Sequence, residues 1–353
     1  MPDNKDPLQE KYKLVLETIN AYPLQLKQSW EEIRPIHVPD EYKNIDNIVY
    51  CGMGGSALGA RIVKSYAFGT LRVPIEIVNG YTLPQYTGKN TLVFVSSYSG
   101  STEETVESTY AALEKGSKIF GVTTGGKLSE ILQKENLPGY IFNPIHNPSL
   151  QPRMAIGYSV GSILALFSKL GFLDTTDEEI EKSQVAMHIA LSNFSESVPT
   201  EKNIAKNFAE KIKGRIPIFV ASEHLVGAVH TIKNQFNESS KTFSAIFDIP
   251  ELNHHLMEGL KNPAKLRELL TFVLVNSNLY SDKIKKRYPL THDVIDKNNV
   301  KTFEFTPESN QKLSQVFETL IFGSYSSYYL TKIYGIDPME IPWVDYFKLQ
   351  LAK

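Results

Sequence analysis

Short apolar runs rich in β-branched residues alternate with stretches of helical periodicity through the first half of the chain. The runs have the length and composition of buried strands, and the stretches between them have the apolar spacing of helices. Strands are expected at 47–51, 75–78, 92–95, 118–123 and 140–142, and helices at 9–33 (interrupted near Pro23), 105–115, 128–133 and 154–170. This alternation produces a parallel sheet covered by helices on both faces. The sequence therefore predicts an α/β fold.

The second half of the chain repeats the pattern. Strands are expected at 216–220, 245–247, 271–275 and 302–305, with helices at 203–212, 225–236, 265–270 and 313–334. A chain of 353 residues is longer than a typical single domain. The stretch 175–200 is more polar than its surroundings and ends in Val198-Pro199. We therefore predict two domains, 1–195 and 196–353.

A cluster of hydroxyl side chains follows the strand expected at 92–95. Ser97, Ser99, Ser101 and Thr102 surround one glycine and precede a helical stretch. The start of a helix carries unpaired N–H groups and a partial positive charge, which attract phosphate. The same residues also fit an ordinary strand–helix turn in which Thr102 caps the helix. Taken alone, the stretch leaves phosphate binding and capping equally open.

A second loop of small residues, Gly-Met-Gly-Gly-Ser-Ala at 52–57, follows the strand expected at 47–51. Glycines at such a place let the backbone come close to a ligand. The third glycine of a dinucleotide-binding fingerprint is missing, although Glu76 stands roughly where the acidic residue of that fingerprint belongs. An NAD site is thus disfavoured but not excluded. A Walker A loop is excluded, because no Gly-Lys-Ser/Thr follows.

The charge and the cysteine content exclude other classes of protein. A formal net charge of −2 offers no clustered positive charge for nucleic acid or membrane surfaces. The single cysteine, Cys51, rules out an intrachain disulfide, and its place at a strand end favours a buried small residue over a nucleophile. The polar N-terminus lacks the apolar core of a signal peptide, and no apolar window could span a membrane. We expect a soluble, cytoplasmic protein that binds neither nucleic acid nor membranes.

Candidate acid–base side chains stand in the second half. Glu238 is expected in or just beyond the last turn of the helix at 225–236, where a carboxylate opposes the helix dipole. His254 and His255 share a short polar loop, but rings at adjacent positions point in different directions. Without a cluster of zinc-like spacing or a G-x-S-x-G elbow, neither a metal site nor a serine hydrolase is expected. A carboxylate and an imidazole could instead perform general acid–base chemistry beside a phosphate.

The motifs, in their order along the chain, resemble those of a known family. The loops at 52–57 and 96–104 are similar to the phosphosugar-binding loops of the sugar isomerase (SIS) fold. Further segments resemble the bifunctional phosphoglucose/phosphomannose isomerases: Gln151-Pro152-Arg153, Asn237-Glu238, Pro250-Glu251-Leu252-Asn253-His254 and Lys348. The resemblance covers about 48–348. It implies two SIS domains, each a flavodoxin-like parallel β-sheet flanked by helices on both faces, with an active site between them.

The resemblance also implies a role for each matched residue. Glu238 would be the base that moves a proton between C2 and C1 of the open-chain sugar. His254 would assist ring opening, and Lys348 would help that step or contact the substrate. Arg153 would stabilise the cis-enediolate, because arginine keeps its charge throughout. Five residues would bind the substrate and its phosphate: Gly55, Ser56, Ser97, Ser99 and Thr102.

The implied activity is the interconversion of glucose 6-phosphate and fructose 6-phosphate, and of mannose 6-phosphate and fructose 6-phosphate, with no cofactor and no metal. The resemblance further implies a homodimer with active sites at the subunit interface, to which the partner chain can contribute the histidine. A phosphosugar-binding protein without catalysis and an SIS isomerase for another phosphosugar remain alternatives. Two positions depart from the family pattern. His255 follows His254 where asparagine is common, so it could compete for the role, and Ser101 replaces a larger polar residue at a position that should be tolerant.

Overall fold

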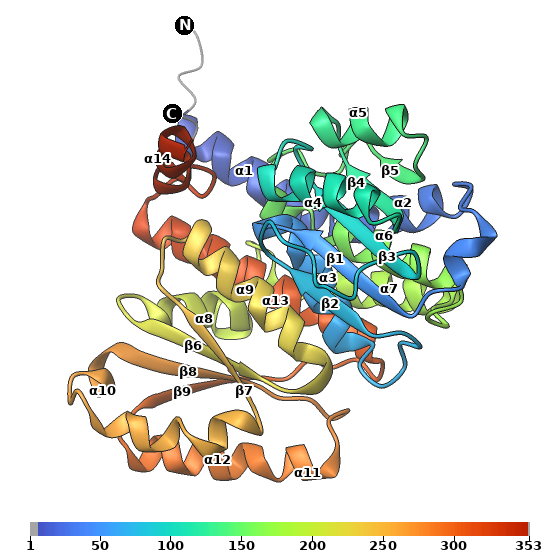
Figure 1. Cartoon of the computed structure of the whole chain (residues 1–353). Coiled ribbons are helices and arrows are strands. Elements are labelled where there is room, and N and C mark those ends of the chain that lie inside the picture. The colour runs from blue at the N-terminus through green and yellow to red at the C-terminus, as the bar shows by residue number, and fades with distance from the viewer. Residues whose placement is uncertain (1–5, 352–353) are drawn as a thin grey trace, which may run out of the picture. The chain divides into compact units, whose positions relative to one another are not determined.

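A computed structural model describes residues 6–351 (Figure 1). Contacts between residues divide the chain into two compact units, each with its own sheet. The first-sheet unit contains Ala21–Val185, and the second-sheet unit contains the residues up to Asn20 and those from Ala186 onward. Within residues 6–351, no helix is both long enough and apolar enough to cross a bilayer.

The first-sheet unit contains five parallel strands in the order β2-β1-β3-β4-β5. This is the strand order of the flavodoxin-like fold, in which ligands bind beyond the carboxyl ends of the strands, where the order reverses between β1 and β3. The sequence prediction of a parallel α/β sheet is confirmed here. The strands are β1 (Asn47–Gly52), β2 (Ile75–Val78), β3 (Thr91–Ser97), β4 (Lys118–Thr123) and β5 (Gly139–Ile141).

Both faces of this sheet are covered, because successive side chains of a strand point to opposite sides. Val49, Val93 and Ile119 form a core with Ala112 and Leu128 from two helices on one face. On the other face, Phe94 packs against Tyr50 and Phe120 and meets Phe167 edge-on. The helices of this unit are α2 (Tyr22–Ile33), α3 (Leu58–Tyr66), α4 (Glu103–Glu114), α5 (Gly126–Lys134) and α6 (Ile156–Lys169), together with the first part of α7 (Asp177–Phe194).

The second-sheet unit contains four parallel strands in the order β7-β6-β8-β9, which reverses between β6 and β8. They are β6 (Ile216–Ala221), β7 (Ala245–Asp248), β8 (Leu270–Val275) and β9 (Lys301–Phe305). Helices α8, α9 and α13 lie on one face of this sheet, and α11 and α12 lie on the other (Figure 1). The helices are α1 (Pro7–Asn20), α8 (Ile204–Ile212), α9 (Val226–Glu238), α10 (Leu266–Leu269), α11 (Asp282–Lys285), α12 (Arg287–Lys297), α13 (Lys312–Tyr334) and α14 (Pro342–Leu351).

Short 3₁₀ turns join many of these elements. Three of them hold motif residues: η2 (Gly54–Ala57), η3 (Pro152–Met154) and η6 (Glu251–His254). The others are η1 (Asp40–Lys43), η4 (Thr200–Lys202), η5 (Glu223–Leu225) and η7 (Met257–Lys261). Turns η2 and η6 follow strands β1 and β7, and η3 precedes helix α6, positions at which binding residues are common.

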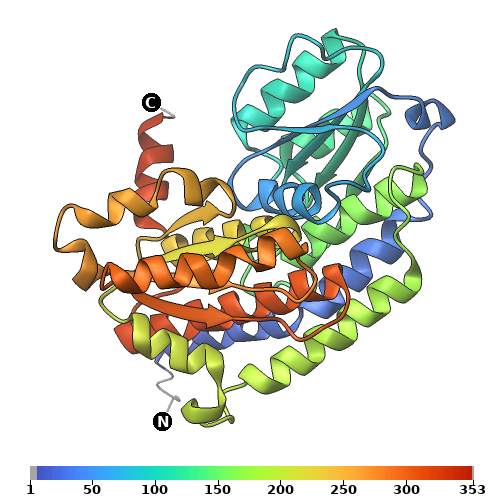
Figure 2. The same cartoon turned by 90° about the horizontal axis from the view of Figure 1, so that it is seen from below.

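The largest difference from the sequence prediction is helix α7. The stretch 175–200 was expected to separate two domains, but it contains this 18-residue helix, drawn in yellow-green in Figure 2. The boundary between the two compact units falls inside it, between Val185 and Ala186. Most polar residues of α7 are exposed, while Met187 and Phe194 are buried. The division into 1–195 and 196–353 stays a prediction about independently folding domains.

Other differences are local. The helix expected at 265–270 is observed as the short α10, which spans four residues, and Leu270 already belongs to β8. Helices α12 and α14 were not predicted. The helix expected at 9–33 is confirmed as two helices, α1 and α2, which break at Ala21, two residues before the proline that predicted the interruption. Helix α1 packs on α13, where the Tyr12 hydroxyl donates to the carbonyl oxygen of Ile336 at 3.1 Å.

Candidate active site

The glycine loop (residues 52–57) and the serine loop (residues 96–104) stand at the ends of β1 and β3, the two strands between which the order of the first sheet reverses. A side-chain hydrogen bond joins them: the backbone N–H of Tyr98 donates to the Ser56 hydroxyl at 2.9 Å. The hydroxyl of Tyr50, on β1, donates to the carbonyl oxygen of Ser56 at 2.8 Å and so anchors the glycine loop to the sheet. The Ser56 hydroxyl keeps its own proton to donate to a ligand.

The serine loop presents hydroxyl groups that do not cap the following helix. Thr102 is the N-cap residue of α4, but its side chain makes no capping hydrogen bond. Its hydroxyl instead pairs with that of Ser97 at 2.8 Å, and Ser97 also accepts the N–H of Gly100 at 3.0 Å. The exposed Ser99 hydroxyl accepts the N–H of Ser101 at 3.3 Å. The Thr102 side chain therefore does not cap α4, in contrast to the capping interpretation that the sequence also allowed.

Gly100 holds the serine loop against the start of α5. Its φ is +71°, and a Cβ at this position would lie 1.7 Å from the carbonyl oxygen of Gly125. The Gly100 carbonyl accepts the N–H of Leu128 at 2.8 Å. Any other residue would have to move one of the two turns, since a left-handed backbone and a close approach are both required. In the sequence, Gly100 indicates only a loop. Its contact with Gly125 is not visible there, because Gly125 lies 25 positions farther along the chain.

Gly55 brings the glycine loop into contact with the turn that carries Arg153. A Cβ on Gly55 would lie 2.7 Å from the backbone nitrogen of Arg153 and 2.7 Å from the carbonyl carbon of Pro152. Arg153 is 1% exposed, and its Nη1 donates to Oε1 of Gln151 at 2.8 Å. The motifs at 52–57 and 151–153, about a hundred residues apart, are therefore neighbours in the fold.

A small cavity lies beside these loops and is lined by residues of both loops, of η3 and of α6, among them Ser56, Tyr98 and Pro152. Its volume is about 20 Å³. That is about the space of a single water molecule and far below the volume of a sugar phosphate. A phosphate would therefore contact the outer, open side of the loops, where Ser99 is exposed.

Cys51, the single cysteine of the chain, is buried at the end of β1. Burial raises the pKa of the Cys51 thiol to about 12, with the Ser108 hydroxyl opposing the shift, so the thiol stays protonated and is a poor nucleophile. This agrees with the prediction of a buried structural cysteine. In the part of the chain that the structure describes, no three His, Cys, Asp or Glu side chains gather as metal ligands would.

Glu238 is the last residue of α9, as its sequence position predicted. The turn after it is held by Lys241, whose ammonium donates to the carbonyl oxygen of Glu238 at 2.9 Å and to that of Asp337 at 2.8 Å. Asn237 donates its amide to the carbonyl oxygen of Lys233 at 2.8 Å. The neighbours of Glu238 are thus bonded to the backbone, which fixes the position from which its half-exposed carboxylate projects.

The histidine loop is anchored through Asn253. Its amide nitrogen donates to Thr291 at 2.8 Å, and its amide oxygen accepts from Arg287 at 3.3 Å, both on α12. His254 and His255 are exposed, and the ring of His255 lies 6.1 Å from that of Phe247. The contact with Phe247 gives His255 a packing role, while His254 projects from the end of η6.

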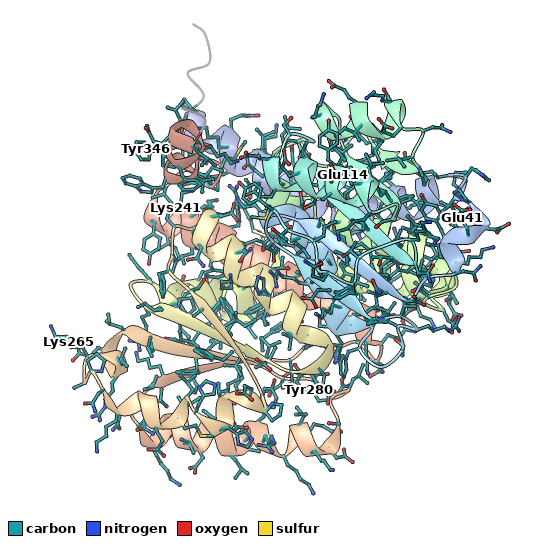
Figure 3. All side chains as sticks on the ribbon, viewed as in Figure 1. Glu41, Glu114, Lys241, Lys265, Tyr280 and Tyr346 are labelled. Atoms are coloured by element: carbon teal, nitrogen blue, oxygen red, sulfur yellow. The ribbon has the colours of Figure 1, made fainter. Side chains whose placement is uncertain are left out.

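Lys348 lies on α14, an exposed helix without a buried residue. Trp343, Tyr346 and Phe347 on the same helix are also exposed. Lys241, which follows Glu238, and Tyr346 of α14 lie at the same end of the second-sheet unit (Figure 3). The hydrogen bond from Lys241 to Asp337 joins the turn after Glu238 to the segment that precedes α14.

Glu238 and His254 lie at opposite edges of the second sheet. Helix α9 ends at Glu238, shortly before β7 begins at Ala245, and η6 starts at Glu251, shortly after β7 ends at Asp248. Lys241 and Lys265, which precede β7 and β8, are on one side of the unit, and Tyr280, which follows β8, is on the other (Figure 3). The four residues of β7 separate the two edges by roughly 13 Å at about 3.3 Å per residue. Within one chain, Glu238 therefore precedes β7 at one end of the sheet, and His254 follows β7 at the other end.

Comparisons with known proteins agree with these motifs. The model of the bacterial phospho-glucose isomerase C-terminal SIS domain matches residues 201–351. The bifunctional phosphoglucose/phosphomannose isomerase of Caldicellulosiruptor bescii is 32% identical over 344 residues, which cover 96% of this chain and 99% of that protein. The enzyme of the same name from Aquifex aeolicus is 28% identical over 347 residues, 98% of this chain and 99% of that one.

A solved structure extends the likeness to the fold. The crystal structure of a hypothetical protein from Thermus thermophilus superposes with a TM-score of 0.74 at 16% identity, over 98% of this chain and 94% of that one. This likeness concerns the fold alone, whereas the identity to the Caldicellulosiruptor protein runs through both units of the chain. On this similarity, the chain belongs to the family of bifunctional phosphoglucose/phosphomannose isomerases.

Proposed function

We propose that this protein is an aldose–ketose isomerase that interconverts glucose 6-phosphate and fructose 6-phosphate, and mannose 6-phosphate and fructose 6-phosphate. The observation that supports the proposal most is the full-length similarity to enzymes of that name, together with the joined glycine and serine loops. The proposed site residues are Gly55, Ser56, Ser97, Ser99 and Thr102 for the substrate and its phosphate, with Arg153, Glu238, His254 and Lys348 for the chemistry.

The proposed reaction needs no oxidant and no reductant. His254, assisted by Lys348, moves protons while the sugar ring opens. The carboxylate of Glu238 then removes the proton from C2, and the electron pair of the C2–H bond forms the cis-enediolate. Arg153 stabilises the negative O1 of this intermediate. The proton of the C2 hydroxyl then moves to O1, and Glu238 returns its proton to C1 as the C2 carbonyl of the ketose forms. For mannose 6-phosphate the proton is exchanged on the other face of C2.

A homodimer with active sites at the subunit interface accompanies this proposal. A base at C2 and an acid at the ring oxygen must each lie within about 3 Å of adjacent parts of one sugar. The roughly 13 Å between the two edges of the second sheet favours a site in which Glu238 of one chain works with His254 of another. The exposed aromatic side chains of α14 offer apolar surface for such an assembly. We also propose a cytoplasmic location, which the protonated, unpaired Cys51 fits.

Proton NMR in D₂O tests the activity directly. We expect the pure protein to exchange the C2 proton of glucose 6-phosphate and of mannose 6-phosphate for deuterium, because removal of that proton is the central step. Binding of these sugars without exchange would instead show a phosphosugar-binding protein without catalysis. Exchange confined to glucosamine 6-phosphate or a heptose phosphate would show an isomerase for another phosphosugar.

Replacing Thr102 by valine should raise KM for fructose 6-phosphate by about 5- to 50-fold and lower kcat by less than about threefold. The change removes one hydroxyl beside Ser97 while keeping the side-chain shape, and a phosphate anchor contributes equally to substrate and transition state. Initial-rate kinetics measure both constants. Thr109→Val on the same helix, whose hydroxyl donates to the carbonyl oxygen of Thr105 at 2.7 Å, is the matched control. A drop in kcat at unchanged KM would assign Thr102 to the chemistry instead.

A further inference from the structure

A side-chain hydrogen bond connects the serine loop to the proline-rich loop at residues 143–152, which leads to Arg153. Tyr98 stands in the serine loop between Ser97 and Ser99, and its hydroxyl accepts from Nδ2 of Asn147 at 2.9 Å. Burial raises the pKa of this hydroxyl, although the bond from Asn147 lowers it, so the group stays protonated. Asn147 is fully buried.

From Asn147 the network continues to Arg153. The same Nδ2 donates to the carbonyl oxygen of Gln151 at 3.1 Å, and Oδ1 of Asn147 accepts the Ser149 hydroxyl at 2.8 Å. The side chain of Gln151 then accepts from Nη1 of Arg153 at 2.8 Å and donates to the carbonyl oxygen of Ser149 at 3.3 Å. A continuous set of hydrogen bonds thus runs from a phosphate-binding loop to the proposed oxyanion-stabilising guanidinium.

The frame around this loop is held by Gln25 of helix α2. Its amide nitrogen donates to the carbonyl oxygens of His146 at 2.9 Å and Met154 at 3.1 Å, one before and one after the network. Its amide oxygen accepts the N–H of Gly157 at 3.1 Å. Since both ends of the loop are bonded to a neighbouring helix, the loop cannot absorb the loss of an internal bond by moving as a whole.

Because Arg153 is buried, the direction of its guanidinium depends on protein acceptors such as Gln151. A guanidinium that is 1% exposed cannot replace a lost partner with bulk water, so it turns to whatever acceptors remain. Its value to the reaction depends on direction, because a charge stabilises the enediolate only from the correct side and distance. Gln151 supplies an acceptor that fixes this direction, and Asn147 holds Gln151 through its backbone.

We propose that Gln151 and Asn147 are positioning residues for the isomerisation: Gln151 orients the guanidinium of Arg153, and Asn147 couples that orientation to the serine loop through Tyr98. This inference rests on the proposed function of Arg153. It assigns the two residues an action through others, since neither needs to touch the substrate. A substrate phosphate bound at the serine loop would therefore favour the correct alignment of the Arg153 guanidinium.

The central test replaces Gln151 by methionine, which has similar length but no acceptor. We expect kcat for fructose 6-phosphate to fall by about 10- to 100-fold, with KM within about threefold of the wild-type value. A second readout is affinity for a phosphosugar mimic with a planar hydroxamate anion in place of the enediolate, measured against affinity for inorganic phosphate. Gln151→Met should weaken the mimic in proportion to kcat and leave phosphate unchanged. Gln133→Met, at an exposed glutamine of α5, is the matched control.

A variant that restores the acceptor distinguishes a positioning role of Gln151 from a purely structural role. Gln151→Glu keeps an acceptor for Arg153 and should recover most of the lost kcat, whereas a purely structural role would leave both variants equally impaired. If Gln151→Met does not fold, Gln151→Asn, whose shorter side chain holds the amide farther from Nη1, carries the same expectation. Wild-type kcat and wild-type affinity for the mimic in folded Gln151→Met or Gln151→Asn would overturn the proposal.

The coupling to the serine loop is tested with Tyr98→Phe. We expect this variant to raise KM. We also expect the double variant with Gln151→Met to lose less kcat/KM than the product of the two single losses in kcat/KM, because both changes break one network. Independent, multiplicative losses would overturn the role of Asn147. Tyr66→Phe, whose hydroxyl bonds Glu179, is the control. If the wild-type protein isomerises no phosphosugar, the proposed function fails, while the comparison of mimic with phosphate still tests the orientation of Arg153.

Discussion

Replacing Glu238 by glutamine is expected to lower kcat for fructose 6-phosphate by about 10²- to 10⁴-fold, the usual contribution of a general base. The amide keeps the shape of the side chain but cannot accept the C2 proton. Folding should not suffer, because a carboxylate at the end of α9 opposes the helix dipole and its neutralisation is favourable. Coupled assays measure turnover, and deuterium exchange at C2 measures the proton transfer itself.

A matched control for this variant exists in the same unit. Glu210 stands in the last turn of α8, is exposed, and opposes a helix dipole in the same way. Glu210→Gln should keep wild-type kinetics while changing stability in the same direction as Glu238→Gln. Near-native turnover of Glu238→Gln would remove Glu238 from the mechanism and, with it, the proposed route through C2.

Mixing two inactive variants is expected to restore activity. We expect Glu238→Gln and His254→Asn to be inactive as homodimers, and a heterodimer of the two to regain about half of the wild-type turnover. In the heterodimer, one site combines both altered residues and the other combines both intact ones. This expectation follows from the opposite edges of the second sheet at which Glu238 and His254 lie. Co-expression with two different affinity tags isolates the heterodimer for the measurement.

The same experiment can contradict the proposed assembly. If Glu238 and His254 of one chain served one site, every site of the heterodimer would carry one defect and no activity would return. His255→Asn provides the control, since its ring lies beside Phe247 and should leave turnover close to that of the wild type. An inactive His255→Asn that also complements Glu238→Gln would transfer the role of the acid from His254 to His255.

Much of the fold was predictable because its signals are local. Each of strands β1 to β9 was expected within two residues of its observed bounds, since a short run of β-branched residues between turns reports a buried strand directly. Helix α7 was missed for the opposite reason. Its buried face is defined by packing, and its polar residues resemble a linker when only the order of residue types is known. The four-residue α10 was overestimated because the apolar residues around Leu270 serve the strand β8.

The candidate site likewise has features that the sequence shows and contacts that only the fold shows. The hydroxyl loop, the glycine loop, the carboxylate at a helix end and the adjacent histidines are all visible in the sequence, and so is their resemblance to an isomerase family. Their partners are not. That Thr102 pairs with Ser97 and does not cap α4, that Gly55 touches the turn of Arg153, and that Tyr98 receives a bond from Asn147 depend on residues brought together by the chain.

The sequence by itself determined that this protein is a parallel α/β protein of a phosphosugar isomerase family, with a hydroxyl loop suited to phosphate. Only the tertiary structure decided that Gln151 holds Arg153 and that Glu238 and His254 stand at opposite edges of one sheet. The physical reason is that periodicity and turn chemistry act over a few neighbouring residues. Strand order, by contrast, determines which distant loops share an edge of a sheet.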